Sequence, residues 1–323
     1  MSEGEGSQPE RGATRAEPAE EREMSELDFA YVGLGVHEEV VYSVADELGY
    51  YADEGVRVSI RDGVRWDDER LRRAAVVGLG RTLLIRLLAG TPWTMLCVNT
   101  EHPLFWLMAR AEFADVSELR GRRVAMHPAL VAPGCFTRII LRGRGLDPDT
   151  DIEAVPMHPG DYSDHIRMLK NGELDAAVIG STWSPEQLVA EEGLRLLLFF
   201  GDELRIPTTG VAVDPGVVAL DDPRTRGVVR ANLRALGSML ADPALGAEHV
   251  RRLLPAADAA TARDFYDRYV GAHFRPDGRP DVDVVAKALP LVADELRIIT
   301  GRAVGVPPAD QIYRADLTSA WTP

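Results

Sequence analysis

Apolar and polar residues along the chain form a pattern that predicts strands and helices in turn. A buried strand begins near Leu27 in the run LDFAYVGLG and ends in a glycine-rich turn. The next segment, HEEVVYSVADELG, predicts a helix that stops at Gly49. Its apolar face would consist of Val40, Val41, Val44, Ala45 and Leu48. The strand VRVSI follows, and strand-like and helix-like stretches then alternate as far as DAAVIG at residues 175–180.

Strands that alternate with helices predict parallel sheets covered by helices, which is an α/β architecture. Beyond about residue 213 the pattern changes to long helical stretches at 225–240, 259–270 and 282–299. We therefore expect a helical cap with few strands in the last third of the chain. Residues 1–26 are rich in Glu, Gly, Pro, Ser and Ala and almost lack large apolar side chains, so they predict a disordered acidic tail.

Composition narrows the possible functions. The chain has 323 residues, 46% of them hydrophobic, and can bury a core of about two lobes. A formal charge of −15 argues against nucleic-acid binding, which relies on basic surfaces. No uncharged apolar run of about 18 residues occurs, so we expect no membrane insertion. The first 26 residues have no apolar signal region, which leads us to expect a cytoplasmic protein.

Cysteine and histidine usage predicts neither disulfides nor metal. Cys97 and Cys135 are the two cysteines, and neither belongs to a CxxC pair or a zinc-type spacing with histidine. No spacing of the seven histidines indicates a metal site. We expect no metal and no cofactor.

Five ordered phrases carry a family resemblance: VADELGYYADEGVRVSI, LLAGTPWTMLCV, VSELRGRRVAM, the helix leading into RGLDPDTDIEAVPM, and MLKNGELDAAVIG. Over roughly residues 28–240 the chain resembles the SsuA/THI5-like (NMT1-type) solute-binding family. The resemblance implies a type 2 periplasmic-binding-protein fold, in which two α/β lobes joined by two crossover strands hold a ligand between them. Lobe 1 would contain residues 27–105 and 205–323, and lobe 2 residues 106–204.

Departures from the family pattern bear on function. Exported members carry a signal peptide, often with a lipid-modified cysteine, which is not seen at residues 1–26. The same fold is used by enzymes that include a thiamin-pyrimidine synthase, a phthalate-type decarboxylase and an aromatic sulfinate desulfinase. The synthase has a cysteine-rich CCCFC-like stretch where this chain has GCFTR. The nucleophilic cysteine of the desulfinase would fall at residues 33–36, where this chain has no cysteine.

The loop after the first strand offers one set of candidate site residues. Ligands of open α/β sheets lie at the carboxyl ends of strands, where loops lead into helix N-termini. Gly35 permits close approach of a ligand, and His37 with Glu38 could supply a general base and its orienting partner. Alternatively, the acidic residues of this segment only complement the helix dipole.

A second loop, at residues 78–82, is the best candidate for an anion site. Backbone donors at Gly80, the Thr82 hydroxyl and the Arg81 guanidinium could converge on a carboxylate or sulfonate. The loop has neither the P-loop lysine nor the third glycine of a dinucleotide fingerprint. Alternatively, Arg81 extends to solvent from an amphipathic helix.

A third loop, at residues 127–135, contains a candidate nucleophile. Cys135 would begin a helix whose dipole stabilises a thiolate, His127 could serve as its base, and Arg138 could add a donor to the ligand. Alternatively, Cys135 is a small buried hydrophobe.

The fourth loop follows the strand that ends at Gly180. Ser181 and Thr182 could orient polar edges of a ligand, and Trp183 could stack on an aromatic part, unless it serves only packing.

Two functions remain open. In the first, a cytoplasmic, cofactor-independent enzyme of the decarboxylase or desulfinase type closes its lobes over a small anionic aromatic or heteroaromatic molecule. In the second, the protein binds such a ligand without chemistry, as the receptor of an ABC-type uptake system or as a cytoplasmic sensor.

Overall fold

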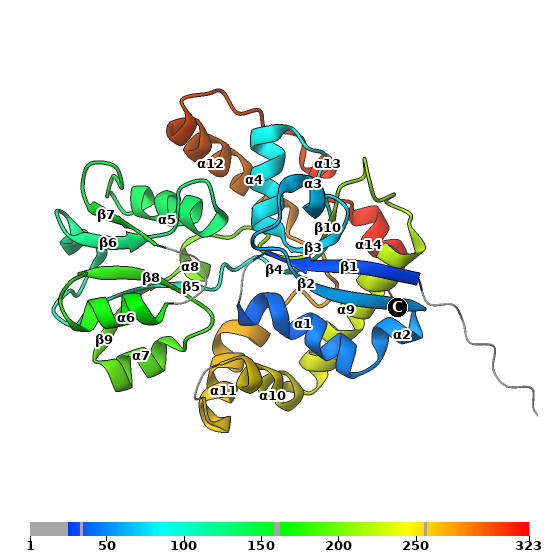
Figure 1. Cartoon of the computed structure of the whole chain (residues 1–323), viewed down its shortest axis with the longest axis horizontal. Helices are drawn as coiled ribbons and strands as arrows, with labels where there is room; N and C mark the ends of the chain where they lie inside the picture. Colours follow the sequence, from blue (N-terminus) through cyan, green and yellow to red (C-terminus); the bar gives the residue numbers. More distant parts are fainter. Residues whose placement is uncertain (1–24, 33–34, 158–161, 255–256, 323) are drawn as a thin grey trace, which may run out of the picture.

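Two five-stranded sheets form the framework of the computed structural model, which describes residues 25–32, 35–157, 162–254 and 257–322. The first sheet has the order β2 (Val56–Asp62), β1 (Ser25–Tyr31), β3 (Ala75–Gly78), β10 (Thr209–Val213) and β4 (Thr94–Thr100). The second has the order β7 (Glu153–Pro156), β6 (Arg123–Met126), β8 (Ala176–Gly180), β5 (Phe105–Arg110) and β9 (Leu194–Phe199). Figure 1 shows the second sheet on the left and the first on the right. The molecule thus has the two-lobed α/β fold of periplasmic binding proteins.

The sheets are mixed, whereas the alternation of strands and helices predicts parallel ones. β1 pairs in parallel with β2 and β3, and β6 pairs in parallel with β7 and β8. β10 runs antiparallel to β3 and β4, and β5 runs antiparallel to β8 and β9. The reason is that β5 and β10 directly follow the passages of the chain from one sheet to the other, so each enters its sheet from the end that faces the other lobe.

Helices cover both sheets. Those of the first lobe's N-terminal part are α1 (Val36–Glu47), α2 (Tyr50–Asp53), α3 (Asp68–Leu71) and α4 (Leu79–Ala89). Those of the second lobe are η1 (Val116–Leu119), α5 (Ala132–Gly143), α6 (Ser163–Lys170), α7 (Pro185–Glu192) and α8 (Phe200–Glu203). The C-terminal third contains α9 (Pro223–Ala241), α10 (Pro243–Leu253), α11 (Ala259–Phe265), η2 (Tyr266–Val270), η3 (Gly271–His273), α12 (Val282–Thr300), α13 (Ala309–Ile312) and α14 (Ala315–Trp321).

Helix α1 buries the apolar face that the sequence predicts. Val40, Val41 and Val44 are buried on one face. The helix ends before Gly49, whose positive φ of 72° suits glycine. Leu48 was expected on the buried face but is 39% exposed, because it follows the last helical turn.

The two sheets are connected by short segments that a buried carboxylate ties together. The chain passes from β4 to β5 at residues 101–104 and returns between β9 and β10, and the predicted lobe boundaries near 105 and 205 lie at these passages. Glu101 is fully buried at the first passage. Its carboxylate accepts hydrogen bonds from Arg205 of the second passage and from the backbone N–H of Asp281, next to α12, both at 2.5 Å.

Helix α12 belongs to the C-terminal third but also contacts the second lobe, where it packs against α5 (Figure 1). The Glu295 carboxylate is 2% exposed and accepts hydrogen bonds from Arg138 at 2.6 Å and Arg142 at 2.9 Å. A buried carboxylate therefore joins the two lobes on this side of the molecule.

The predicted acidic tail at 1–26 lies mostly outside the described residues, and Ser25 and Glu26 already belong to β1. Among the described residues, no helix is both long enough and apolar enough to span a membrane.

Candidate functional site

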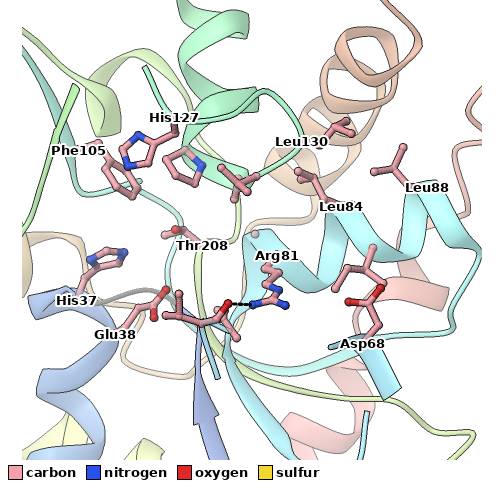
Figure 2. Close-up of a pocket in the computed structure, with 18 of the residues that line it drawn as sticks. His37, Glu38, Asp68, Arg81, Leu84, Leu88, Phe105, His127, Leu130 and Thr208 are labelled. Carbon is pink, nitrogen blue, oxygen red and sulfur yellow. Dashed lines mark hydrogen bonds between the residues drawn. The ribbon is translucent and has the colours of Figure 1, made fainter. Parts of the chain in front are cut away.

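A cavity of about 480 Å³ lies between the lobes (Figure 2). One side is formed by Val32 after β1, by α1, α3, β3 and α4, and by residues Val64 and Thr208. The other side is formed by β5, the 127–133 segment that leads into α5, and Tyr162. Its volume falls in the range of pockets that bind small organic molecules. Both lobes thus contribute to one candidate ligand site.

The N-terminal end of α1 brings His37 and Glu38 to the cavity, where the sequence predicts them. Both side chains are buried, with exposures of 6% and 9%. His37 Nδ1 lies 2.9 Å from Ser181 Oγ of the other lobe, so the two form a hydrogen bond across the cleft. A Cβ atom on Gly35 would lie 2.6 Å from the same Oγ, so glycine permits this approach. Burial lowers the pKa of His37 to about 3, which makes it neutral at pH 7.

His127 approaches the cavity from the second lobe. It is 4% exposed, and its Nε2 lies 3.1 Å from the Tyr162 hydroxyl. Its Nδ1 is buried without a hydrogen-bond partner among the described residues. Burial, with a smaller contribution from His165, lowers the pKa of His127 to about 4. Phe105 lies between the two cavity histidines, with its ring edge-to-face to each at 6.0 Å between centroids (Figure 2).

The predicted anion loop at the start of α4 lies at the cavity, but most of its donors form hydrogen bonds within the protein. Arg81 donates to the backbone carbonyls of Gly63, Val64 and Trp66 at 2.9–3.1 Å. The Thr82 hydroxyl is buried and donates to the carbonyl of Leu79. The backbone N–H groups of Leu79 and Gly80 both donate to the carbonyl of Thr208.

These contacts give the loop a structural role. Arg81 holds the 63–66 segment against α4 and does not extend to solvent. Gly80 lines the cavity and lets the lobes approach, since a Cβ there would lie 2.9 Å from the Ala132 Cβ of α5.

Cys135 and Arg138 lie outside the lining of the cavity. Cys135 is fully buried, and burial raises the pKa of its thiol to about 12, with Glu295 adding to the rise. The expected stabilisation of a thiolate by the helix dipole is outweighed by this desolvation. Arg138 binds Glu295 and Asp149, so its guanidinium faces α12 and not a ligand.

Of the residues predicted in the loop after β8, Ser181 acts on the cleft through its hydrogen bond to His37, which lines the cavity. Ser181 is buried and holds His37. Thr182 and Trp183 are absent from the cavity lining, and Trp183 lines a separate surface hollow with residues of α6 such as Ile166 and Lys170. The Trp183 indole therefore does not lie where it could stack on a ligand in the cavity, as the sequence predicts.

A model of the family described as NMT1/THI5 like matches residues 38–245, well over half of the chain. The chain belongs to the NMT1/THI5-like family. Riboflavin-binding protein RibY of Chloroflexus aurantiacus is 23% identical over 213 residues, which are 62% of this chain and 59% of RibY. The match thus spans about three fifths of that relative.

Solved structures with the same fold include binding proteins and an enzyme. The periplasmic sulfonate-binding protein SsuA of Methylobacillus flagellatus is 13% identical, with a TM-score of 0.69 over 93% of this chain and 94% of SsuA. The desulfurization enzyme DSZB is 15% identical, with a TM-score of 0.64 over 92% of this chain and 98% of DSZB. At these identities the similarity establishes the fold that this NMT1/THI5-like protein shares with them.

Several cavity residues of this NMT1/THI5-like protein were not singled out from its sequence. They are Asp68, Leu84, Leu88, Phe105, Leu130, Tyr162 and Thr208. Phe105 and Thr208 could have been found, since they lie at the two passages between lobes that the family fold implies. The leucines carry no local signal, because they look like ordinary members of an amphipathic helix or loop. No cluster of three or more potential metal ligands occurs in the part of the chain that the structure describes.

Proposed function

We propose that this NMT1/THI5-like protein binds a small, uncharged organic molecule between its lobes, as a binding protein and not as an enzyme. The observation that carries the proposal is the charge of the cavity lining. Arg81 is the one arginine or lysine among the described lining residues, and three backbone carbonyls accept hydrogen bonds from its guanidinium. The side chains of Glu38 and Asp68 also line the cavity, so an anion would meet two carboxylates against one guanidinium.

The neutral state of both histidines supports the same choice of ligand. With pKa values lowered to about 3 and about 4, His37 and His127 carry no positive charge at pH 7. A neutral imidazole still offers a donor and an acceptor. It can therefore fix the orientation of a neutral heteroaromatic molecule. RibY, named for binding riboflavin, is a relative whose named ligand is of this chemical class.

The low basicity of the cavity groups favours binding over catalysis. A general base works best when its pKa lies near the working pH, and both cavity histidines fall well below it. Cys135 is buried as a thiol and is no part of the cavity lining. These facts weigh against the lyase chemistry that the sequence favours.

Closure of the lobes would then be the output of binding. The SsuA structure from Methylobacillus flagellatus is named for a sulfonate ABC transporter, so delivery to a transporter of this type is one role that this proposal allows. A sensor is the other, and it fits the cytoplasmic location that the sequence predicts.

Calorimetric titration and thermal unfolding with riboflavin, butanesulfonate and benzoate test the proposal. We expect riboflavin to bind and to stabilise the protein by about 2.7 kcal/mol at a hundred times its Kd, and the two anions to leave unfolding unchanged. Mass spectrometry after incubation should recover the ligand intact. A Leu130→Trp variant narrows the cavity entrance and should slow binding, whereas Leu240→Trp, at another exposed leucine outside the lining, should not.

Two results would overturn the proposal. Binding of butanesulfonate or benzoate in preference to riboflavin would restore the anionic ligand that the sequence predicts. A product of new mass that forms at a protein-dependent rate would restore the enzyme.

A further inference from the structure

A hydrogen bond between His37 and Ser181 joins the cavity wall of the first lobe to the second lobe. His37 lines the cavity and Ser181 does not, and their Nδ1 and Oγ atoms lie 2.9 Å apart. Both residues are buried, with exposures of 6% and 1%, so water does not readily take the place of either partner. The contact therefore forms only when the lobes are as close together as they are here.

Each partner is fixed within its own lobe. His37 lies in the first turn of α1, where the next two N–H groups donate to the carbonyl of Gly35. Ser181 directly follows β8, and the N–H of Trp183 donates to the carbonyl of Gly180 at 3.3 Å, which closes a turn around it. The distance between the hydroxyl and the imidazole thus depends mainly on how the two lobes are placed relative to each other.

Gly35 shows that the chain leaves space for this contact. Its backbone is extended, with φ −173° and ψ 148°, which any residue can adopt. A Cβ atom at this position would lie 2.6 Å from Ser181 Oγ and 3.1 Å from two ring atoms of His37. Glycine is therefore needed here for the approach of the other lobe and not for the backbone conformation.

We infer that Ser181 is a positioning residue of the ligand site, which acts through His37 to hold the lobes closed. Its hydroxyl fixes the imidazole in the wall of the cavity, and release of a ligand requires this hydrogen bond to break. The part that concerns release rests on the proposed function, and the part that concerns the lobes does not. Ser181 then governs how long a ligand stays bound and has little influence on how fast it enters.

The size of the effect follows from the kind of hydrogen bond. His37 is neutral at pH 7, because burial lowers its pKa to about 3, so the bond joins two neutral groups. Loss of one such bond changes an equilibrium by about three- to ten-fold. Since a ligand enters before the lobes close, we expect Ser181→Ala to raise koff for riboflavin by about three- to ten-fold. We expect kon to change by less than about two-fold in the same stopped-flow measurements.

Ser43→Ala is the matched control. Ser43 Oγ lies 2.7 Å from His249 Nδ1, so this serine also forms a hydrogen bond with a histidine, but both residues belong to the first lobe. Its loss should leave both rate constants unchanged. In a His37→Phe background, Ser181→Ala should raise koff no further, because the hydroxyl then has no imidazole to hold.

Spin labels attached at Leu48→Cys and Val189→Cys test the closed arrangement without a ligand. The two positions are 39% and 45% exposed, and they lie directly after α1 and within α7, which are the helices next to the two partners. The two native cysteines are buried and should stay unlabelled. We expect Ser181→Ala to shift the distances between the labels to longer values, and Ser43→Ala to leave them unchanged.

The outcomes distinguish this inference from the proposed function. If koff rises no more in Ser181→Ala than in Ser43→Ala, or if Ser181→Ala keeps its full effect in the His37→Phe background, the inference fails, while riboflavin binding still supports the proposed function. If the natural protein does not bind riboflavin, the proposed function is overturned, and the label distances alone decide the inference. Equal distances in the two serine variants then overturn it, and longer distances in Ser181→Ala support it.

Discussion

Gly80→Ala should destabilise the closed arrangement of the lobes, although the same change stabilises most helices. Gly80 is the second residue of α4, and a Cβ atom there would lie 2.9 Å from Ala132 Cβ and 3.2 Å from the ring of Phe136. Carbon atoms make their best contacts at about 3.5–4.0 Å, so the lobes would have to separate by about 0.6 Å or more. The obstacles are a backbone-attached methyl and a rigid ring, neither of which can turn away.

The size of the effect follows from two opposed contributions. Replacing glycine by alanine within a helix contributes about 0.8–1 kcal/mol of stability, and less near the N-terminus. Overpacking a well-packed contact costs about 1–3 kcal/mol. Gly237→Ala in α9 is the matched control, because a Cβ there would meet no atom within 4 Å. We expect Gly80→Ala to be less stable than Gly237→Ala by about 1–3 kcal/mol.

Urea unfolding of the two variants measures this difference, and a double-mutant cycle identifies its cause. Adding Ala132→Gly to Gly80→Ala removes the nearer obstacle and should recover part of the loss, with a coupling of at least about 0.5 kcal/mol. Equal stabilisation by Gly80→Ala and Gly237→Ala, with no coupling to position 132, would show that the lobes do not meet in solution as they do here.

Three further outcomes are expected. Glu295→Ala should cost about 3 kcal/mol in urea unfolding, because the buried Arg138 then keeps only the half-exposed Asp149 as its partner. Asp294→Ala, at an exposed residue, should cost under about 1 kcal/mol, and equal costs would contradict the buried contact. Cys135 should resist iodoacetamide at pH 8 until the protein is unfolded, and fast alkylation of the native protein would refute its burial. Burial lowers the pKa values of His37 and His127, so below about pH 6.5 the unfolded chain binds more protons than the folded protein does. The free energy of unfolding should therefore fall by about 1.4 kcal/mol per pH unit for each of the two histidines as the pH drops from 6.5 toward 4. His37→Phe should make that fall shallower, and an unchanged slope would exclude its part.

The sequence predicts the strands and helices well because each of them is determined by a local pattern of apolar residues. The apolar runs at β3 and β8 are buried along their whole length, which is the pattern that marked them as strands. His37 and His127 were expected near a ligand because each follows a strand, and in the structure both line one cavity. Both histidines reach this cavity because β1 and β6 direct their carboxyl ends toward the same cleft.

The rest of the candidate site depends on contacts that no local pattern reveals. Arg138 was a reasonable ligand donor by position, but its carboxylate partner Glu295 lies 157 residues away in sequence. Arg81 was a reasonable anion site until three carbonyls of the 63–66 segment accepted its hydrogen bonds. In both cases the sequence indicates correctly that the arginine donates hydrogen bonds, but it does not reveal the acceptor, because the acceptor is brought close by tertiary packing.

The attachments of α12 have a mechanical consequence. One end of the helix starts where the buried Glu101 accepts a hydrogen bond from the N–H of Asp281, at the pivot between the lobes, and its C-terminal half is attached to α5 through Glu295. A helix attached at the pivot and at the second lobe limits how far the two lobes can separate, and Pro290, which lies between the two attachments, is where the helix can bend. The segment from Gly301 to Pro308 follows α12 and lies beyond both of its attachments. A fluorophore placed there would move with the end of α12 and report the tilt of the helix without entering the cleft.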